Sequence, residues 1–139
     1  MWSIARSENV HRRLKRFQKK HRRELANAFD NLDTFFKCLQ AGAGPAQIQR
    51  GFVHPEPSGI LAIDQKGSGA HLKQVRLYIY PDEQTETLYV VTLGDKASQE
   101  GDIRFCKAFV EGIRTKKDAK ADDATDGLKK GQDDAHVGQ

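Results

Sequence analysis

The sequence predicts an α+β fold, in which helices pack on a small, mainly antiparallel sheet of three to four strands. Three patterns support this prediction. Apolar residues recur at helical spacing between residues 8 and 40, apolar and polar residues alternate over residues 74–80, and a second helical stripe occupies residues 103–113. Because 139 residues with 37% hydrophobic content can form one core, we expect a single domain over residues 1–114.

The N-terminal part predicts a short strand followed by a helical hairpin. Residues 2–6 alternate between apolar and polar character, as a brief strand does. Ser7 is then a good N-cap, and Val10, Leu14 and Phe17 form the apolar stripe of a first helix. A second stripe of leucine and phenylalanine over residues 25–39 stops at the glycines and proline of residues 42–45. We expect the two helices to pack on the sheet as a hairpin.

The middle of the chain predicts the strands and then a C-terminal helix. Residues 49–53 and 59–64 are extended segments separated by Pro55 and Pro57. Residues 74–80 and 87–93 form two strands joined by a tight connection at residues 81–83. The second of these strands runs into Gly94, and the amphipathic stripe of the final helix follows.

Residues 115–139 have a different composition. They contain five lysines and six aspartates among small and polar residues, and Leu128 and Val137 are their only large apolar side chains. Such a segment cannot bury enough apolar surface to offset the entropy lost on ordering. We therefore expect a disordered, charged tail.

Composition and charge exclude several classes of protein. No run of 18 apolar residues and no signal peptide is recognisable, so we expect a cytoplasmic protein without a membrane partner. Cys38 and Cys106 lie in apolar helical patterns, far from a second cysteine or clustered histidines, so neither a disulfide nor a metal site is expected. No phosphate-cradling glycine-rich loop occurs, and no cofactor is expected.

Two cations have unusual positions in the predicted sheet. Arg76 lies in the middle of a strand, and Lys96 follows the next strand directly after Gly94. Basic groups fixed on a sheet suggest a surface that handles an anion. The alternative is structural, because Arg76 could pair with an acid such as Asp64 or Glu86.

Several segments together resemble one known family. They are the Gly-Phe-Val-His-Pro-Glu-Pro-Ser-Gly run at residues 51–59, Ala-Ile-Asp-Gln-Lys-Gly at 62–67, Arg-Leu-Tyr-Ile-Tyr at 76–80 and Leu-Gly-Asp-Lys at 93–96. With the basic helical hairpin they resemble toxins of the RelE/ParE superfamily, most of all its ParE-like branch, over residues 1 to about 114. The resemblance implies the toxin of a bacterial type II toxin–antitoxin system, neutralised by a partly disordered antitoxin.

The resemblance leaves two activities open. Members of the superfamily either cleave messenger RNA in the ribosome, as metal-independent endoribonucleases, or poison DNA gyrase, and a shared fold does not choose between them. We expect growth inhibition by cleavage of messenger RNA. The alternative is a protein without catalysis, either a gyrase poison or an inactive toxin fold that binds nucleic acid.

The resemblance also implies roles for individual residues. Arg76 matches the arginine that contacts the scissile phosphate in the RNA-cleaving branch, and Lys96 falls in the basic cluster after its last strand. Both are therefore candidate catalytic residues. Further candidates for a cationic pocket or for stacking on a base are Lys66, Lys73, Tyr78 and Tyr80.

No general acid or base is evident in the final helix. RNA-cleaving members carry a tyrosine or histidine in or after that helix, where this chain has Phe105 and Phe109. The histidines nearest the predicted site are His54 and His71, and either could transfer a proton near neutral pH.

The basic N-terminal helix suggests a second surface. The formal net charge is +4, yet residues 1–27 hold nine lysines or arginines and two acids. These cations could bind the phosphates of nucleic acid, including ribosomal RNA, or receive an acidic antitoxin segment. They could also form a merely solvated helix face. The candidate binding residues are Arg12, Arg13, Arg16, Lys19 and Lys20.

Overall fold

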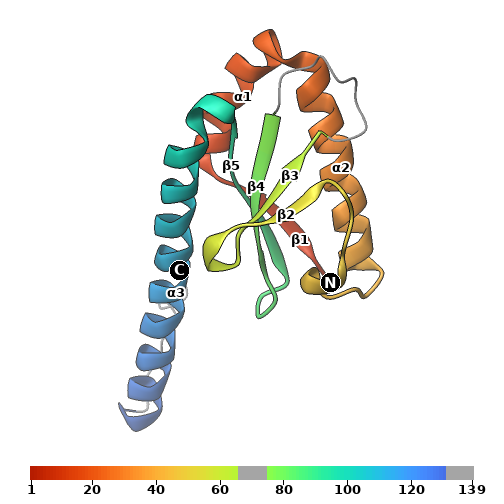
Figure 1. Ribbon diagram of the computed structural model, residues 1–139. Helices are drawn as coiled ribbons and strands as arrows, with labels where there is room; N and C mark the ends of the chain where they lie inside the picture. The colour runs from red at the N-terminus through yellow and green to blue at the C-terminus, as the bar shows by residue number, and fades with distance from the viewer. Residues whose placement is uncertain (66–74, 131–139) are drawn as a thin grey trace. The chain divides into compact units, whose positions relative to one another are not determined.

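A computed structural model describes residues 1–65 and 75–130 of the chain and has the predicted α+β class (Figure 1). Three α-helices, five strands and three short 3-10 helices are present in these residues. In chain order the elements are β1 (Ser3–Arg6), α1 (Glu8–Lys20), α2 (Arg22–Gln40), η1 (Pro45–Gln47), β2 (Val53–Pro55), η2 (Pro57–Gly59), β3 (Leu61–Asp64), β4 (Val75–Asp82), β5 (Thr87–Asp95), η3 (Lys96–Ser98) and α3 (Gln99–Lys130).

The five strands form one mixed sheet in the order β1-β5-β4-β3-β2. The β4–β5 hairpin is its centre, β3 and β2 extend it by antiparallel pairing, and β1 pairs with β5 in parallel. The β4–β5 register shifts between Tyr78 and Ile79, because Tyr78 pairs with Thr92 whereas Ile79 pairs with Val90. This bulge places one additional residue in β5.

The expectation of three to four strands is too low. Two short edge strands complete the sheet: β1 has four residues and β2 has three. The extended segment expected at residues 49–53 forms its strand later, at Val53–Pro55. Pro55 is compatible with this position because an edge strand tolerates a residue that has no N–H to donate.

The expected helical hairpin also differs from the structure. Only His21 separates α1 from α2, with φ −135° and ψ 50°, whereas antiparallel neighbouring helices need a loop of about two to five residues. The two helices instead spread over the same face of the sheet (Figure 1). There α1 packs on β5, and α2 packs on β3 and β4.

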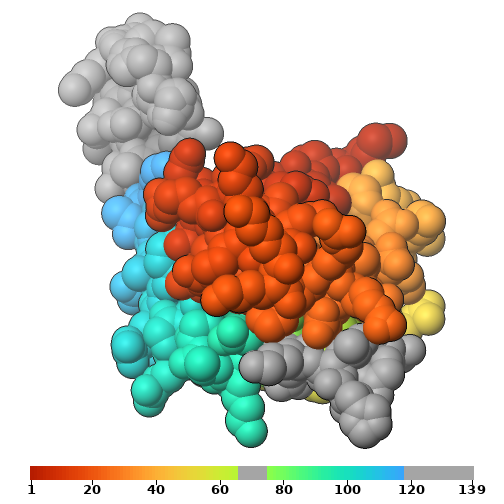
Figure 2. All heavy atoms as spheres, turned by 90° about the horizontal axis from the view of Figure 1, so that it is seen from above, coloured from red at the N-terminus to blue at the C-terminus, as the bar shows by residue number. Residues whose placement is uncertain are grey.

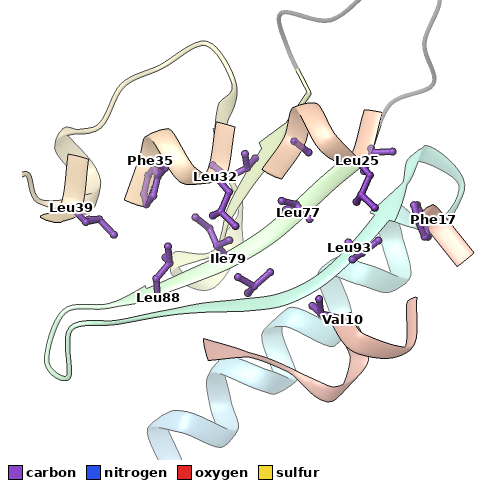
Figure 3. Packing of buried hydrophobic residues seen from close by; sticks show 14 of the residues in the cluster. Val10, Phe17, Leu25, Leu32, Phe35, Leu39, Leu77, Ile79, Leu88 and Leu93 are labelled. Atoms are coloured by element: carbon purple, nitrogen blue, oxygen red, sulfur yellow. The ribbon is translucent and has the colours of Figure 1, made fainter. Parts of the chain in front are cut away.

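The hydrophobic core lies between this sheet face and the two helices. Figure 3 shows side chains of α1 and α2 pointing towards those of β4 and β5. The alternation of β4 supplies one set and the helical stripes supply the other, as their periodicities require. The central residues are Val10, Phe17, Leu25, Leu32, Phe35, Leu39, Leu77, Ile79, Leu88 and Leu93, all at most 4% exposed.

The start of α1 covers the edge of β5 that β1 leaves open. β1 ends after pairing with Val90, so the following carbonyls of β5 need other donors. Ser7 donates its N–H to the Val90 carbonyl at 3.0 Å and its hydroxyl to the Val91 carbonyl at 2.5 Å. Six residues further, Arg13 Nη1 donates to the Leu93 carbonyl at 2.8 Å. These bonds anchor α1 to the sheet.

The beginning of α3 lies against the end of β5. A Cβ atom on Gly94 would collide with the carboxylate of Asp102 and the hydroxyl of Ser98, so only glycine permits this approach. Asp102 is 1% exposed and accepts hydrogen bonds from Arg13 Nη1 at 2.6 Å and from Ser98 Oγ at 2.7 Å. A buried carboxylate, with a hydrogen bond to each oxygen, therefore links the start of α3 to α1 and η3.

The last helix is longer than expected. The composition predicts a disordered tail over residues 115–139, whereas α3 extends to Lys130. Residues 115–130 contain no proline and several alanines and lysines, which are good helix formers, so local propensity favours a helix. Residues 131–139 of the expected tail lie outside the described residues.

The chain divides into two compact units, residues 1–107 and 108–139. The first contains the whole sheet, and the second begins within α3. Among the described residues, no helix combines the length and the apolar character that crossing a membrane requires.

Candidate functional site

The sheet face opposite α1 and α2 carries a cluster of polar side chains. Since alternate residues of β4 point into the core, Arg76 and Tyr78 point to this second face. The register sets Asp64 of β3 beside Arg76. His54 of β2 pairs with Ala62, which in turn pairs with Tyr78, so His54 shares the same face. Three neighbouring strands thus bring the polar residues together.

His54 and Asp64 form a hydrogen-bonded pair in this cluster. The His54 Nε2 atom lies 2.6 Å from Asp64 Oδ2. The side chain of Asp64 is 9% exposed, whereas that of His54 is 35% exposed. A buried carboxylate that holds one ring nitrogen fixes the orientation of the imidazole and leaves the other nitrogen for a ligand. The pair is therefore suited to proton transfer at the surface of the sheet.

Arg76 lies among carboxylates. Its Nη1 atom is 3.5 Å from Glu56 Oε2, and the two side chains are 17% and 14% exposed. The alternative pairing of Arg76 with Glu86 is wrong, because Glu86 forms an ion pair with the amino group of Met1. Asp64 faces Arg76 across the β3–β4 ladder. The guanidinium charge is consequently offset by nearby acids, and the cluster is not a purely cationic pocket.

Tyr78 is completely buried, so it does not stack on a base in this structure. Its hydroxyl has no hydrogen-bond partner among the described residues. Burial raises the pKa of Tyr78 to about 12, with Asp102 and Glu56 adding to the shift and Arg76 opposing it. Burial likewise raises the pKa of Cys106 to about 12, which leaves that thiol protonated and unreactive.

Tyr80, the second stacking candidate, is half-buried. Its ring stacks on Tyr89 of β5, with centroids 6.4 Å apart and an interplanar angle of 22°. Gly59 also lies close to the ring, since a Cβ there would be 3.4 Å from Tyr80 Cε1. Tyr80 thus packs against neighbouring residues and is only partly exposed to a ligand.

Of the lysines proposed for a cationic pocket, Lys96 lies within the described residues. Lys66 and Lys73, together with His71, lie outside the described residues. Lys96 is exposed in η3. The carboxylate of the neighbouring Asp95 caps η3, because it accepts a hydrogen bond from the N–H of residue 98 at 3.1 Å.

The α1 cations divide into two kinds. Arg13 is tied to Asp102 and to β5, so it belongs to the framework of the fold. The remaining candidates on this helix are exposed, and α1 and the start of α2 form one face of the molecule (Figure 2, red to orange). These exposed cations are Arg12, Arg16, Lys19 and Lys20.

No protein-family model matches the sequence, and neither a curated protein nor a solved structure matches it. The likeness to RelE/ParE toxins thus rests on the sequence segments named above and on the coarse α+β fold. Within the part of the chain that the structure describes, no group of three or more His, Cys, Asp or Glu side chains is placed to hold a metal ion.

Glu56 and the role of Asp64 were not foreseen from the sequence. Glu56 had a detectable signal, because Pro55 and Pro57 restrict the backbone on both sides of it and so position its side chain. The pairing of Asp64 with His54 had no such signal. Ten residues separate the two, and only the register of β2 against β3 brings them into contact.

Proposed function

We propose that the protein inhibits growth as a toxin of the RelE/ParE type, by cleaving messenger RNA in the ribosome without a metal ion. The observation that carries the proposal is the His54–Asp64 pair beside Arg76 on one sheet face. Cleavage of a phosphodiester by its own 2′-hydroxyl needs a group that takes a proton and a cation that stabilises the developing charge. The cluster contains one of each.

The proposed roles follow from the contacts. The imidazole of His54, held by Asp64 at 2.6 Å, takes the proton of the 2′-hydroxyl as that oxygen attacks phosphorus. Arg76 donates to the non-bridging phosphate oxygens, whose negative charge increases in the transition state. The bond to the 5′-oxygen breaks, that oxygen collects a proton from solvent, and a 2′,3′-cyclic phosphate remains.

Induced expression followed by mapping of transcript ends tests this proposal. We expect codon-phased cleavage in translated messages, and we expect His54→Gln to abolish it because glutamine cannot accept a proton. His11→Gln is the matched control, since His11 is exposed on α1. Arg76→Gln should also lower cleavage while the purified protein remains folded. Growth arrest with intact transcripts would refute the nuclease proposal.

A second candidate function is supported by the acids around Arg76. Glu56 at 3.5 Å and Asp64 on the adjacent strand offset the charge that a phosphate would need. A toxin fold that binds without cleaving, as a gyrase poison or as an inactive nucleic-acid-binding protein, is compatible with that arrangement. Broken chromosomal DNA with intact transcripts is the outcome that favours the gyrase poison.

The proposed partners are the ribosome with its message, or DNA gyrase, and an antitoxin with an acidic segment. The support for these partners is the exposed basic face of α1, which suits either phosphates or carboxylates. Affinity for RNA that falls steeply with salt concentration, and falls further in Arg12→Gln or Lys19→Gln, would identify α1 as a phosphate-binding surface.

A further inference from the structure

The loop that carries Glu56 is constrained by two prolines and a backbone hydrogen bond. Glu56 lies between Pro55 and Pro57, and its N–H donates to the Ile60 carbonyl at 2.8 Å, which closes a short loop between β2 and β3. Within that loop Ser58 has φ 65°, in the left-handed region that non-glycine residues seldom adopt. The backbone at Glu56 is therefore held by groups other than its own carboxylate.

The ion pair between Glu56 and Arg76 is longer than a charge-assisted hydrogen bond. Arg76 Nη1 and Glu56 Oε2 are 3.5 Å apart, whereas a charge-assisted N–H···O bond measures about 2.7–2.9 Å. The Nε atom of Arg76 is buried and has no hydrogen-bond partner among the described residues. The guanidinium thus keeps donor capacity that the carboxylate does not use.

We propose that the Glu56 carboxylate stands in for a phosphodiester at Arg76, and that an RNA phosphate binds this cluster by exchanging with it. The carboxylate is a planar oxyanion and the phosphodiester is a tetrahedral one. A guanidinium can bind either of them through two N–H donors. The proposal deepens, and rests on, the function proposed above, since it names Glu56 as the residue that regulates access to the anion subsite.

The proposal predicts a gain of binding from the loss of one charge. Glu56→Gln keeps the shape of the side chain and the loop, but removes the negative charge that competes with the phosphate. Because the pair is partly buried, we expect affinity for a phosphodiester to rise about tenfold, the equivalent of roughly 1.4 kcal/mol. The gain should require Arg76, so Glu56→Gln combined with Arg76→Gln should lose it.

Equilibrium binding of a short 2′-O-methyl RNA, which cannot be cleaved, tests this prediction in the full chain. Glu83→Gln is the matched control, because it removes the same charge from an exposed position in the β4–β5 turn. Circular dichroism and thermal unfolding establish that each variant is folded. As a second measurement, the NMR shift of the Arg76 side-chain N–H during titration with inorganic phosphate should move at lower phosphate concentration in Glu56→Gln.

The outcomes separate this inference from the proposed function. Equal affinities of Glu56→Gln and Glu83→Gln, or a gain that persists without Arg76, would overturn the exchange at Glu56 even if the unaltered protein cleaves messenger RNA. A tenfold gain that depends on Arg76, in a protein that neither cleaves transcripts nor arrests growth, would support the anion subsite and reject the nuclease.

Discussion

Arg13 should stabilise the fold rather than bind nucleic acid, although the sequence places it among the exposed cations of α1. Its Nη1 atom donates to Asp102 Oδ1 at 2.6 Å and to the Leu93 carbonyl at 2.8 Å. The side chain of Asp102 is 2% exposed and that of Arg13 is 27% exposed. Replacing Arg13 with methionine keeps most of the side-chain length and removes the partner of a buried carboxylate.

The expected loss of stability follows from that burial. Removing one partner of a buried ion pair costs about 3–5 kcal/mol, because the other charge stays buried without compensation. The hydroxyl of Ser98 still donates to Asp102 at 2.7 Å, which places the expected loss at the lower end, about 3 kcal/mol. For a domain of this size, that loss corresponds to a decrease of about 10–15 °C in Tm.

Urea and thermal unfolding of Arg13→Met, with Arg12→Met as the control, provide the assay. Arg12 is exposed on the same helix, so its replacement should change the free energy of unfolding by less than about 0.5 kcal/mol. Adding Asp102→Asn to Arg13→Met should restore part of the loss, since the buried charge disappears. Equal stabilities of Arg13→Met and Arg12→Met would refute the structural role of Arg13. Arg13 would then again be a candidate for binding nucleic acid.

Three further predictions concern the framework of the site. Gly94→Ala should lower Tm markedly in thermal unfolding, because the new methyl group would collide with Asp102 and Ser98; a variant as stable as the parent would show that the start of α3 is free to shift. Ser7→Ala should cost about 1–2 kcal/mol in urea unfolding, because Ser7 Oγ caps α1 through the N–H of residue 10 at 3.2 Å and also bonds to β5. The pKa of Tyr78 is raised from 10.0 to about 12, so the folded state favours the neutral phenol. The stabilisation that Tyr78 contributes is therefore complete below pH 10 and is lost as the pH rises from 10 to 12. Tyr78→Phe should therefore reduce the loss of Tm over this pH range and leave stability at pH 7 unchanged or higher, whereas a pH profile identical to that of the parent would contradict the assigned shift.

The large elements of this fold could be predicted because each has a local signal. Ser7 is a favourable N-cap, the apolar residues of α2 recur at helical spacing, and β4 alternates between two faces over several residues. The short strands β1 and β2 lack enough residues for a clear period, and α3 continues into a segment whose composition suggested disorder. Helix propensity and the hydrophobic period are both local signals. For residues 115–130 the propensity favours a helix, whereas the lack of an apolar period favours disorder.

The polar cluster depended on contacts between strands. Arg76 was found as a cation within a strand, since its neighbours in sequence reveal the alternation of β4. Its partner Glu56, by contrast, comes from a loop twenty residues away, and His54 meets Asp64 only through the β2–β3 register. Helical spacing sets Arg13 beside the stripe of Val10 and Phe17, but it does not reveal the partner of Arg13, because the buried carboxylate of Asp102 lies on α3.

The sequence by itself determined the α+β class, the two N-terminal helices, the central hairpin and the position of a cation in its first strand. These depend on the spacing of side chains along one segment, which sets which face each segment buries. Tertiary structure alone decided which charges meet. A strand register and the covering helices selected Glu56 for Arg76, Asp64 for His54 and Asp102 for Arg13, because the strength of a charge depends on distance and burial rather than on order in the chain.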